Sequence, residues 1–577
     1  MRLRGLKIER FRGIKSLDWT VDGRVCCLVG AGNNCKTTIL DAIGLLGTTR
    51  TPPFDDFDFH DSDPEAGPIV IEGVFGDLPL SLLADNRFGL DLIGIDEAGV
   101  AHDEPGDHAP GIRVRLDVDV SLEPVWRLIS SRNPEGRLLS TRDRASLLVG
   151  RLGSDPNRQF SLARGTALSR GVANTEDVGA ILASAYRLAR ASVVGAVDLS
   201  TFEPAVEEVT ATARQVGAGD VADDLSIGLE LSPTSAAGLT LHSGTVPVAN
   251  SGLGTRRLLA LGLELGNSES GGLVCIDEIE HGLEPHRIRH LISVLAGLVE
   301  PTEGSAGGQL IFTSHSPIVL GELGSAGVAV VRSNAGAVDV REVPDDLTAL
   351  IRSTPEAVLA SRVVVGEGKT EVGLLRAYGR RWAVDHDNQS LAQKGIAVVE
   401  GGGHSAPARA AQLASLGYPV VLLADSDTPL TPTPPELTAA GVTVVQWAGG
   451  VSTEERLLSD LSWHSVVAAF ELVVEQDRER ADVVNAILAS PPGKAAMQRA
   501  GLARNDIGDD LTALLTAGLT EVEARSAFAT AAKSKSNGWF KRIDLGEALG
   551  GLALEDTDIQ GTPFASALAD IEGWCHG

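Results

Sequence analysis

Cysteine and aromatic residues are scarce in this sequence. Its 577 residues include five cysteines, and aromatic side chains make up 4% of the chain. No cysteines are spaced as a pair of zinc ligands, and the histidines form no H-E-x-x-H pattern. These absences exclude a disulfide-stapled secreted domain and a zinc enzyme of the common types. The cysteines instead indicate core or incidental thiols of a reducing compartment.

Long apolar runs are also missing. Short runs such as "YPVVLLAD" at 418–425 are well below the roughly 20 residues that a membrane-spanning helix needs. The N-terminal stretch "MRLRGLKIERFRGIKSLDW" has no apolar core of the signal-peptide kind. We therefore expect a cytoplasmic protein without membrane contact.

An excess of positive charge is absent as well. The net charge of -28 at pH 7 argues against a general nucleic-acid coat protein. Local basic clusters at 376–382 and 533–542 are nevertheless compatible with an enzyme that binds DNA on a restricted patch. The length and the 43% share of hydrophobic residues predict roughly two to four domains with substantial cores.

Buried strands alternate with helices in two separate parts of the chain. The first part contains "RVCCLVG", "GGLVCIDEIE" and "GQLIFTSHSP", and the second contains "SRVVVGEG" and "YPVVLLADSD". This alternation predicts two parallel α/β sheets. From about 140 to 235 the spacing is mostly helical, which predicts a helical insertion, and 344–360 predicts a connecting helix.

The stretch "VGAGNNCKTTIL" at 29–40 has the outline of a phosphate-binding loop between a strand and a helix. In such a loop, backbone N–H groups and the helix N-terminus hold the phosphates. Lys36 fits the lysine that reaches the β- and γ-phosphates, and Thr37 fits the hydroxyl that binds Mg²⁺. Cys35 stands where the consensus has glycine, which is acceptable if its φ is negative, as at the start of a helix. Taken alone, the loop is as compatible with an ordinary strand–helix turn.

Three further elements follow in a fixed order. "NSGLGTRR" opens a helix with Ser251, Gly252 and Gly254. The strand "LVCIDEIE" ends in Asp277, suited to hold the Mg²⁺ water shell, and Glu278, suited to orient or deprotonate the attacking water. The strand "IFTSHSP" places His315 where it could sense a γ-phosphate. Acids also close strands for purely structural reasons, so the order of the set matters more than any single member.

This order resembles the ATPase heads of the ABC class, in the SMC and recombination-repair branch, over about residues 1–345. The resemblance implies ATP and Mg²⁺ as cofactors. It also implies a homodimer or higher homo-oligomer, because in that family the S-G-x-G segment of one subunit caps the nucleotide of another. The nucleotide-binding residues that it implies are Gly30, Asn33, Asn34, Cys35, Lys36, Thr37, Thr38, Ser251, Gly252, Gly254 and Asp277, with Glu278 and His315 as catalytic residues.

A second set of acids closes two strands in the C-terminal part. "VVVGEGKTEVGLL" carries Glu367 after a strand and Glu371 on the first turn of the next helix. "VVLLADSD" ends in Asp425 and Asp427, which face the same way if the segment is extended. Clustered carboxylates at a sheet edge bind Mg²⁺ or Mn²⁺, and two such ions can cleave a phosphodiester. The competing interpretation is a set of helix caps and solvated acids.

The E-G-x-x-E and D-x-D pair resembles the Toprim domain. An ATPase head followed by Toprim resembles the OLD (overcoming lysogenization defect) family, which includes Gabija-type defence nucleases. The resemblance implies metal ligands at Glu367, Glu371, Asp425, Asp427 and either Glu454 or Glu455, and a late catalytic lysine at Lys541, with Lys533 and Lys535 as rivals. It further implies DNA as substrate and allows a partner such as a UvrD-like helicase or another defence protein.

The predicted fold class is therefore α/β, with an ABC-type ATPase domain at 1–140 and 236–345. A helical insertion at 141–235 is the candidate dimerisation domain, and a Toprim domain with a helical extension occupies 346–577. The leading functional hypothesis is an ATP-regulated, metal-dependent DNA endonuclease. The alternative is a DNA-binding ATPase clamp whose Toprim domain is a non-catalytic docking module. A strand-passing enzyme is disfavoured, because the three tyrosines lie in no recognisable nucleophile domain.

Overall fold

A computed structural model describes residues 1–160 and 241–577, apart from gaps at 50, 85–86, 148, 244–245, 269–271, 300–306, 477 and 535–537. Only single positions are described between 161 and 240. Most of the predicted helical insertion and Lys535 therefore lie outside the described residues. The described start of that segment contains helix α2 (Thr141–Ala145) and strand β10 (Val149–Leu152), and β10 pairs in parallel with β13 of the large sheet.

The contacts divide the chain into two compact units. One consists of residues 1–26, 37–314 and 335–337, and the other of residues 27–36, 315–334 and 338–577. Among the described helices, none is both long and apolar enough to cross a membrane.

The N-terminal part is built on a sheet of 14 strands, which follow the order β10-β13-β14-β3-β15-β16-β2-β1-β4-β7-β5-β6, with β8 attached to β7 and β9 attached to β8. Its strands are β1 (Arg2–Phe11), β2 (Ile14–Thr20), β3 (Val25–Val29), β4 (Ile69–Gly76), β5 (Ile93–Ile95), β6 (Ala101–His102), β7 (Ala109–Val118), β8 (Val125–Ser130), β9 (Asn133–Leu138), β10, β13 (Leu273–Ile276), β14 (Gln309–Thr313), β15 (Val328–Asn334) and β16 (Ala337–Glu342). The helices of this part are α1 (Lys36–Leu46), α2, α7 (Leu253–Ser268), α8 (Pro285–Val299) and α9 (Pro317–Leu323), beside a small hairpin of β11 (His242–Ser243) and β12 (Val246–Pro247).

This sheet is mixed, which corrects the prediction of a parallel sheet. β10, β13 and β14 run parallel, and β13 and β14 are buried along their length, as parallel strands covered on both faces are. β1, β2, β4 and β7 are antiparallel. Their direction follows from short connections such as the turn between Phe11 and Ile14, since a tight hairpin can only join antiparallel strands.

The C-terminal part holds a four-stranded sheet in the order β18-β17-β19-β20, with every pair parallel. Its strands are β17 (Arg362–Gly366), β18 (Ile396–Glu400), β19 (Val420–Ala424) and β20 (Val442–Gln446). The first strand, β17, is central, and the chain leaves it for β18 on one side before it returns to β19 on the other. Such a switch point opens a crevice at the carboxyl ends of the strands, where ligands bind in open α/β sheets.

Helices enclose this sheet and extend beyond it. They are α10 (Thr348–Ser353), α11 (Glu356–Leu359), α12 (Lys369–Asp385), α13 (Ala406–Ser415), α14 (Pro434–Ala439), α15 (Thr453–Asp460), α16 (Trp463–Val474), α17 (Arg480–Ala489), α18 (Pro491–Ala500), α19 (Leu511–Thr516), α20 (Glu521–Lys533), α21 (Ile543–Glu555) and α22 (Pro563–His576). The predicted connecting helix at 344–360 is thus two short helices, because Pro355 follows α10 and restricts the residue before it to extended backbone. A continuous apolar core runs from the sheet into the extension and includes Trp447, Phe470 and Phe528.

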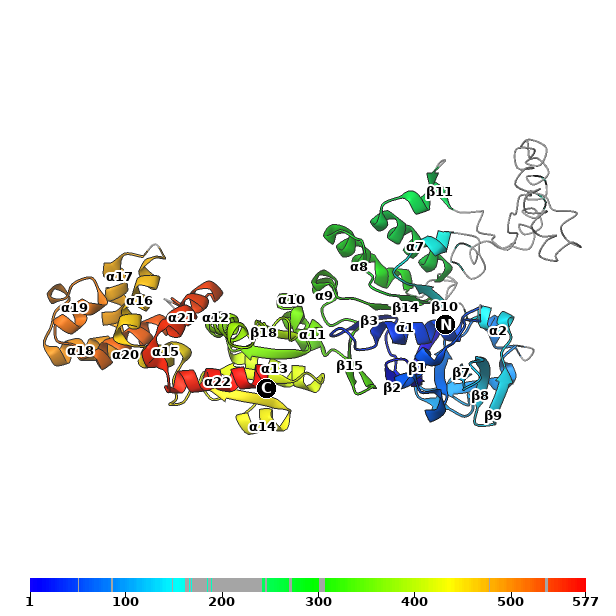
Figure 1. The fold of residues 1–577 in the computed structure, drawn as a ribbon, viewed down its shortest axis with the longest axis horizontal. Helices are drawn as coiled ribbons and strands as arrows, with labels where there is room; N and C mark the ends of the chain where they lie inside the picture. Colours follow the sequence, from blue (N-terminus) through cyan, green and yellow to red (C-terminus); the bar gives the residue numbers. More distant parts are fainter. Residues whose placement is uncertain are drawn as a thin grey trace, which may run out of the picture. The chain divides into compact units, whose positions relative to one another are not determined.

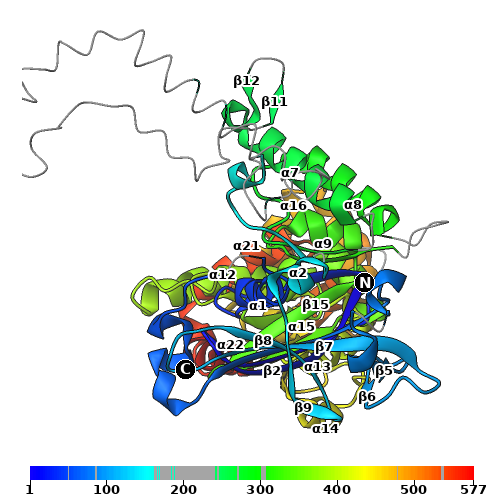
Figure 2. The ribbon, with the colours of Figure 1, turned by 90° about the vertical axis from the view of Figure 1, so that its right-hand side faces the viewer.

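Helices α12 and α21 lie side by side, as Figures 1 and 2 both show. Glycines make the close approach possible. A Cβ atom on Gly546 would lie 2.5 Å from the carbonyl oxygen of Thr370, and one on Gly373 would collide with the backbone of Ile543. The side-chain hydroxyl of Thr370 also donates a 2.9 Å hydrogen bond to the carbonyl of Phe540. The C-terminal extension is therefore fixed to the helix that begins beside the E-G-x-x-E motif.

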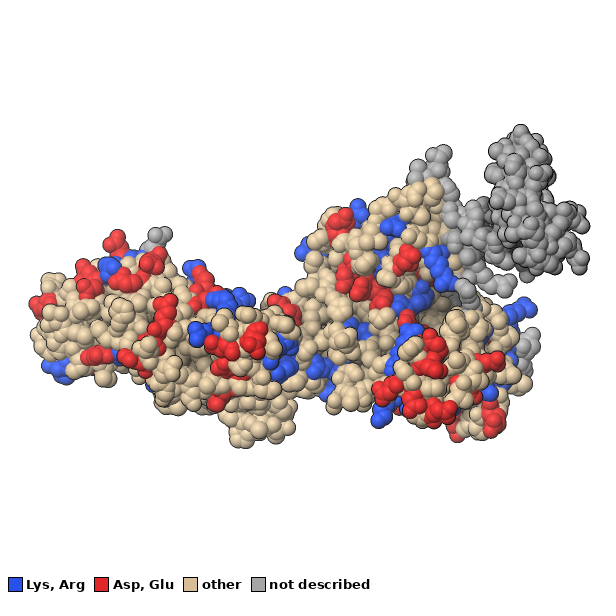
Figure 3. Space-filling view, viewed as in Figure 1, with Lys and Arg blue, Asp and Glu red and all other residues tan. Residues whose placement is uncertain are grey.

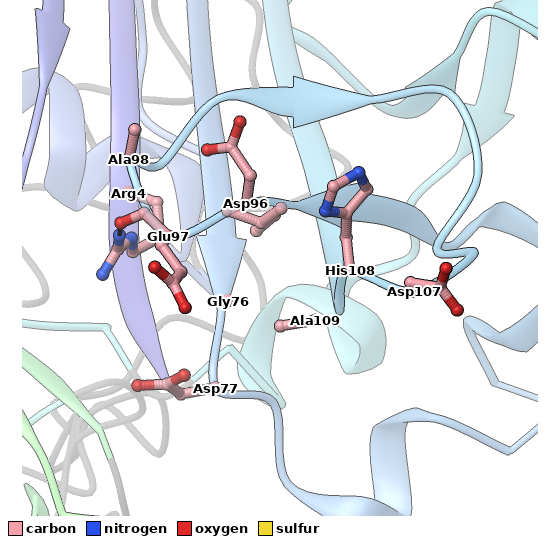
Figure 4. Close-up of a pocket in the computed structure, with 10 residues that line it drawn as sticks. Arg4, Gly76, Asp77, Asp96, Glu97, Ala98, Asp107, His108 and Ala109 are labelled. Carbon is pink, nitrogen blue, oxygen red and sulfur yellow. Dashed lines mark hydrogen bonds between the residues drawn. The ribbon is translucent and has the colours of Figure 1, made fainter.

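A cavity of about 910 Å³ lies among the strands of the first unit, lined by Arg4, Gly76, Asp77, Ile95, Asp96, Glu97, Ala98, Asp107, His108 and Ala109. Figure 4 shows its acidic side chains around Arg4 and His108. None of these residues belongs to the nucleotide-loop or carboxylate motifs, so its size alone does not make it the site of chemistry.

Candidate nucleotide and carboxylate sites

The phosphate loop joins the buried strand β3 to helix α1. Gly30 has a φ of 134°, and a Cβ atom there would lie 2.6 Å from the carbonyl oxygen of Val331, so only glycine fits. Cys35 has a φ of 63°. The expectation that a non-glycine residue is accommodated by a negative φ is therefore wrong. Cys35 instead adopts the left-handed conformation that the consensus glycine would adopt freely.

Lys36 is buried inside its own loop. Its ammonium group donates hydrogen bonds of 3.0 Å to the carbonyl of Gly30 and 2.8 Å to that of Ala31. Only 6% of the residue is exposed. The lysine is thus held at the centre of the loop by weak backbone acceptors, which phosphate oxygens could replace with full negative charge.

Thr37 and Asp277 meet directly. The Thr37 hydroxyl donates a 3.2 Å hydrogen bond to Oδ1 of Asp277, and the Thr313 hydroxyl donates one of 2.7 Å to the same oxygen. The Arg151 guanidinium lies 3.5 Å from Oδ2 of Asp277 and also pairs with Asp41. A hydroxyl and a carboxylate in contact at the start of a phosphate-loop helix are the donors that Mg²⁺ of a bound nucleotide uses.

Glu278 is held from two sides in an unusual conformation. Its φ is 47°, and its backbone N–H donates a 2.8 Å hydrogen bond to the Thr313 hydroxyl. The fully buried Arg257 donates to the carbonyls of Asp277 and Glu278, the latter at 3.1 Å. Sequence analysis did not single out Arg257, Thr313 or Arg151. The only available signal was the "RR" pair after the S-G-x-G segment.

The S-G-x-G segment precedes and opens helix α7, with Ser251 and Gly252 before it and Gly254 in its first turn. A Cβ atom on Gly254 would lie 2.6 Å from the carbonyl oxygen of Gly282, which follows the Asp277–Glu278 strand end. His315 lies just beyond β14 and is exposed. The first turn of the S-G-x-G helix therefore lies close to the loop that follows the acidic strand end.

In the C-terminal sheet, Glu367 and Asp425 lie together at the switch point. The register of β17 on β19 pairs Gly366 with Leu423, so the residues that follow both strands become neighbours. The backbone N–H of Asp425 donates a 2.8 Å hydrogen bond to Oε2 of Glu367. The N–H and hydroxyl of Thr453 each donate 2.8 Å hydrogen bonds to Oδ1 of Asp425.

Glu371 and Glu454 complete a buried carboxylate group. Each is 5% exposed, on the first turns of α12 and α15 respectively. Burial, reinforced by the charge of Glu454, raises the pKa of Glu371 to about 7. Burial and the charge of Glu371 raise the pKa of Asp425 to about 7, and burial also raises the pKa of Glu454. We call Glu367, Glu371, Asp425 and Glu454 the inner cluster.

Asp427 and Glu455, the outer pair, have a different environment. The ammonium of Lys533 lies 2.8 Å from Oε1 of Glu455 and 3.6 Å from Oδ2 of Asp427. Although burial opposes it, the hydrogen bond to Glu455 raises the pKa of Lys533. Glu455 also caps its own helix by accepting a 3.0 Å hydrogen bond from the Ser452 N–H. Of the two candidate metal ligands in "STEERLL", Glu454 therefore belongs to the inner cluster and Glu455 to the outer pair.

A cavity of about 410 Å³ borders the inner cluster and Asp427, and its lining residues are Glu367, Gly368, Lys369, Thr370, Glu371, Glu400, Gly403, Asp425, Asp427, Ser452, Glu454, Lys533 and Lys541. Lys541 is exposed, and its ammonium donates a 3.2 Å hydrogen bond to the carbonyl of Lys533. Glu400 was missed in the sequence, although it closes the strand "IAVVE" as the other acids close theirs.

The described residues hold no preformed group of three metal ligands. The inner carboxylates instead accept hydrogen bonds from neighbouring backbone N–H groups and from Thr453. Their chemistry still fits a hard divalent cation, because oxygen donors of this kind are what Mg²⁺ and Mn²⁺ prefer.

Two family models match parts of the chain. Residues 198–321 match the family "AAA domain, putative AbiEii toxin, Type IV TA system". Residues 358–427 match the family "Overcoming lysogenization defect protein-like, TOPRIM domain". The chain therefore joins an ATPase domain of the AAA/ABC type to an OLD-like Toprim domain. This is the domain composition of the OLD family, and it confirms the resemblance that the motifs predict.

Solved SMC head domains also resemble the chain. An SMC head bound to the C-winged helix domain of ScpA is 12% identical, with 59% of this chain and 97% of that chain covered and a TM-score of 0.32. The SMC head of Thermotoga maritima is 15% identical over 60% and 100% of the two chains, with a TM-score of 0.29. A head from Pyrococcus furiosus, bound to the C-terminal domain of ScpA, is 12% identical over 61% and 98%, with a TM-score of 0.34. No curated protein matches the chain significantly.

Proposed function

We propose that this protein is an ATP-regulated, divalent-metal-dependent DNA endonuclease that nicks or cleaves DNA, in phage defence or DNA processing. The observation that carries the proposal is the inner cluster. Four carboxylates converge at a sheet switch point, and burial makes the charged form of at least three of them unfavourable. A bound cation would stabilise the charged form of these buried acids. A purely structural cluster would not need such a cation.

The inner cluster would hold the ion, and the neighbouring cations would hold the DNA. Mg²⁺ or Mn²⁺ would supply activation of water and stabilisation of the leaving oxygen. Lys541 and Lys369 are exposed at the rim of the same cavity, where they can contact phosphates and offset charge that grows on the scissile group. Asp425 is oriented by Thr453, whose hydroxyl in turn accepts a 2.7 Å hydrogen bond from the Trp447 indole.

ATP would bind at the Gly30–Thr38 loop, with Asp277 on Mg²⁺ and Glu278 beside the attacking water. An ABC-type site also needs the Ser251–Gly254 segment of another subunit, so we expect at least a homodimer. The segment at 141–235, which the sequence predicts to be helical, is the candidate constitutive interface. Light scattering at micromolar concentration, with and without ATP, tests this expectation, and a monomer under both conditions would contradict it.

The rival function is a DNA-binding ATPase clamp with a docking Toprim module. Figure 3 shows acidic and basic side chains intermixed over the face that it draws, in keeping with the net charge of -28. A clamp that coats DNA by general electrostatics would need a broad basic surface. Local cations around a carboxylate cavity instead favour an enzyme that engages a few phosphates.

Plasmid cleavage separates the two functions. We expect the purified protein to nick or linearise supercoiled plasmid with Mn²⁺ or Mg²⁺, and Asp425→Ala to abolish cleavage while ATP hydrolysis stays near the parent rate. Asp385→Ala is the matched control, because Asp385 is an acid of the same domain that pairs with Arg381 at the end of α12. Equal cleavage by the parent and Asp425→Ala would refute the nuclease.

A further inference from the structure

The outer pair already has a cation, whereas none of the described side chains places a cation at contact distance from the inner cluster. Lys533 spans Asp427 and Glu455 with one ammonium group. Among the described side chains, no ion pair within 4.0 Å is formed by Glu367, Glu371, Asp425 or Glu454. Two adjacent groups of carboxylates in one active-site region therefore differ in the way that their charge is balanced.

Lys533 is held in this position by the fold. It is the last residue of α20, and its side chain is 30% exposed. Arg525 of the same helix donates hydrogen bonds of 2.7 Å and 2.6 Å to the carbonyls of Leu458 and Leu461, at the end of α15. Because α15 also carries Glu455, the helix of the lysine and the helix of its carboxylate partner are tied together. The pairing is thus more specific than one between two mobile surface side chains.

An ammonium between two carboxylates takes the place that a bridging divalent cation would take. A cation bound to Asp427 and Glu455 would lie next to the ammonium and be repelled by it. Lysine is also a good point-charge ligand for phosphate. A DNA phosphate entering the cavity would therefore offer Lys533 another anion and leave the outer pair free.

We infer that Lys533 is the counter-ion of the outer pair in the DNA-free enzyme, so that this enzyme takes one divalent cation, at the inner cluster. A second cation binds to Asp427 and Glu455 only after Lys533 leaves them. The inference rests on the proposed nuclease function, because it concerns the same carboxylates. It gives Lys533 a role distinct from that of Lys541, whose ammonium contacts a backbone carbonyl instead of an acid.

Counting bound Mn²⁺ tests the inference without any activity measurement. The full-length protein is titrated with Mn²⁺ in the absence of DNA and nucleotide, and free Mn²⁺ is read by electron paramagnetic resonance. Every protein in this titration also carries Asp277→Asn, which removes the metal site of the ATPase domain. We expect one tight site in this background and two in Lys533→Met, with the affinity of the second site raised about tenfold or more by loss of the nearby charge.

Two further variants sharpen the result. Lys541→Met removes a lysine of the same cavity that touches no carboxylate, and it should keep one tight site. Lys533→Met combined with Glu455→Gln should return the count to one, which assigns the second site to the outer pair. Lys533→Gln, which can still hydrogen-bond to Glu455, serves in place of Lys533→Met if the latter fails to fold.

The inference is overturned by two equally tight sites before Lys533 is changed, by one site in both Lys533→Met and Lys533→Gln, or by no site in any protein. A second site that survives Glu455→Gln also overturns it, because that site lies elsewhere. The nuclease proposal is judged separately by plasmid cleavage. A protein that cleaves DNA through Asp425 but already binds two Mn²⁺ ions would keep its function and lose this role of Lys533.

Discussion

The hydroxyl of Thr37 donates a hydrogen bond of 3.2 Å to Oδ1 of Asp277, although 240 positions separate the two residues. Strand β13 ends at Ile276, so Asp277 projects from the carboxyl end of the sheet toward the start of α1. This contact brings together the two protein groups that a nucleotide-bound Mg²⁺ requires.

We predict that Thr37→Val weakens ATP binding only when Mg²⁺ is present, by about 10- to 100-fold, the loss expected when one hydrogen bond to a charged group disappears. Lys36→Ala should instead abolish binding with or without Mg²⁺. Calorimetry with MgATP and with ATP in EDTA distinguishes the two. Unchanged ATP affinity in Lys36→Ala would mean that the loop does not bind nucleotide.

Cys35→Gly should stabilise the protein by about 1 kcal/mol, because glycine adopts the observed positive φ without the steric cost that a side chain incurs. ATP binding should be equal or tighter. Thermal unfolding and ATP titration provide the measurements. Ala31→Gly, in the same loop but at an ordinary φ, is the control and should not raise the unfolding temperature. A large loss of ATP affinity in Cys35→Gly would reveal a role for the thiol.

Arg257→Lys should lower the kcat of ATP hydrolysis about 10- to 100-fold while leaving ATP binding nearly intact, because Arg257 is fully buried and holds the backbone of Asp277 and Glu278. Arg256→Lys is the matched control. Its guanidinium donates to Asn157 at 2.7 Å and does not touch the acidic strand end. Steady-state kinetics that show a raised KM with unchanged kcat would contradict this positioning role.

The stability of the metal-free protein should fall as pH rises. Glu371 and Asp425 have folded-state pKa values of about 7, above those of the unfolded chain near 4. Their contribution is therefore fully present below pH 4 and is lost as the pH rises through 7. Unfolding temperatures in EDTA between pH 5 and 8 should show this decline, and Mn²⁺ should reverse it at pH 8. Glu371→Gln should make the unfolding temperature depend less on pH. An unchanged pH dependence in that variant would show that Glu371 does not cause the decline.

Much of this architecture was predictable because the decisive motifs are local. "VGAGNNCKTT", "LVCIDEIE" and "VVVGEGKTE" each place functional residues directly after a buried strand, where chain direction alone fixes their location. The ABC-type head and the Toprim sheet were predicted correctly on this basis. Glu371 lies in the first turn of α12 for the same local reason.

Other features depended on contacts that no local pattern encodes. Cys35 adopts a positive φ in a loop that packs closely against β15 through Gly30 and Val331, and this packing has no local sequence pattern. Arg257 acts through carbonyl groups that are distant in sequence, and carbonyls carry no sequence signature. Lys533 reaches the outer pair only because α20 packs on α15, so three neighbouring lysines could not be ranked from the sequence.

The glycine contact between α12 and α21 constrains how this Toprim domain can be divided. The Toprim family match ends at residue 427, yet α21, which begins at Ile543, touches the helix of Glu371 backbone to backbone. A fragment cut to the matched motif would expose that helix face and lose the segment that carries Lys541. The smallest fragment of the candidate nuclease that can fold and be exchanged as a module therefore includes the C-terminal helices around α21. Exchange of modules among relatives is therefore expected to move the motif and the extension together.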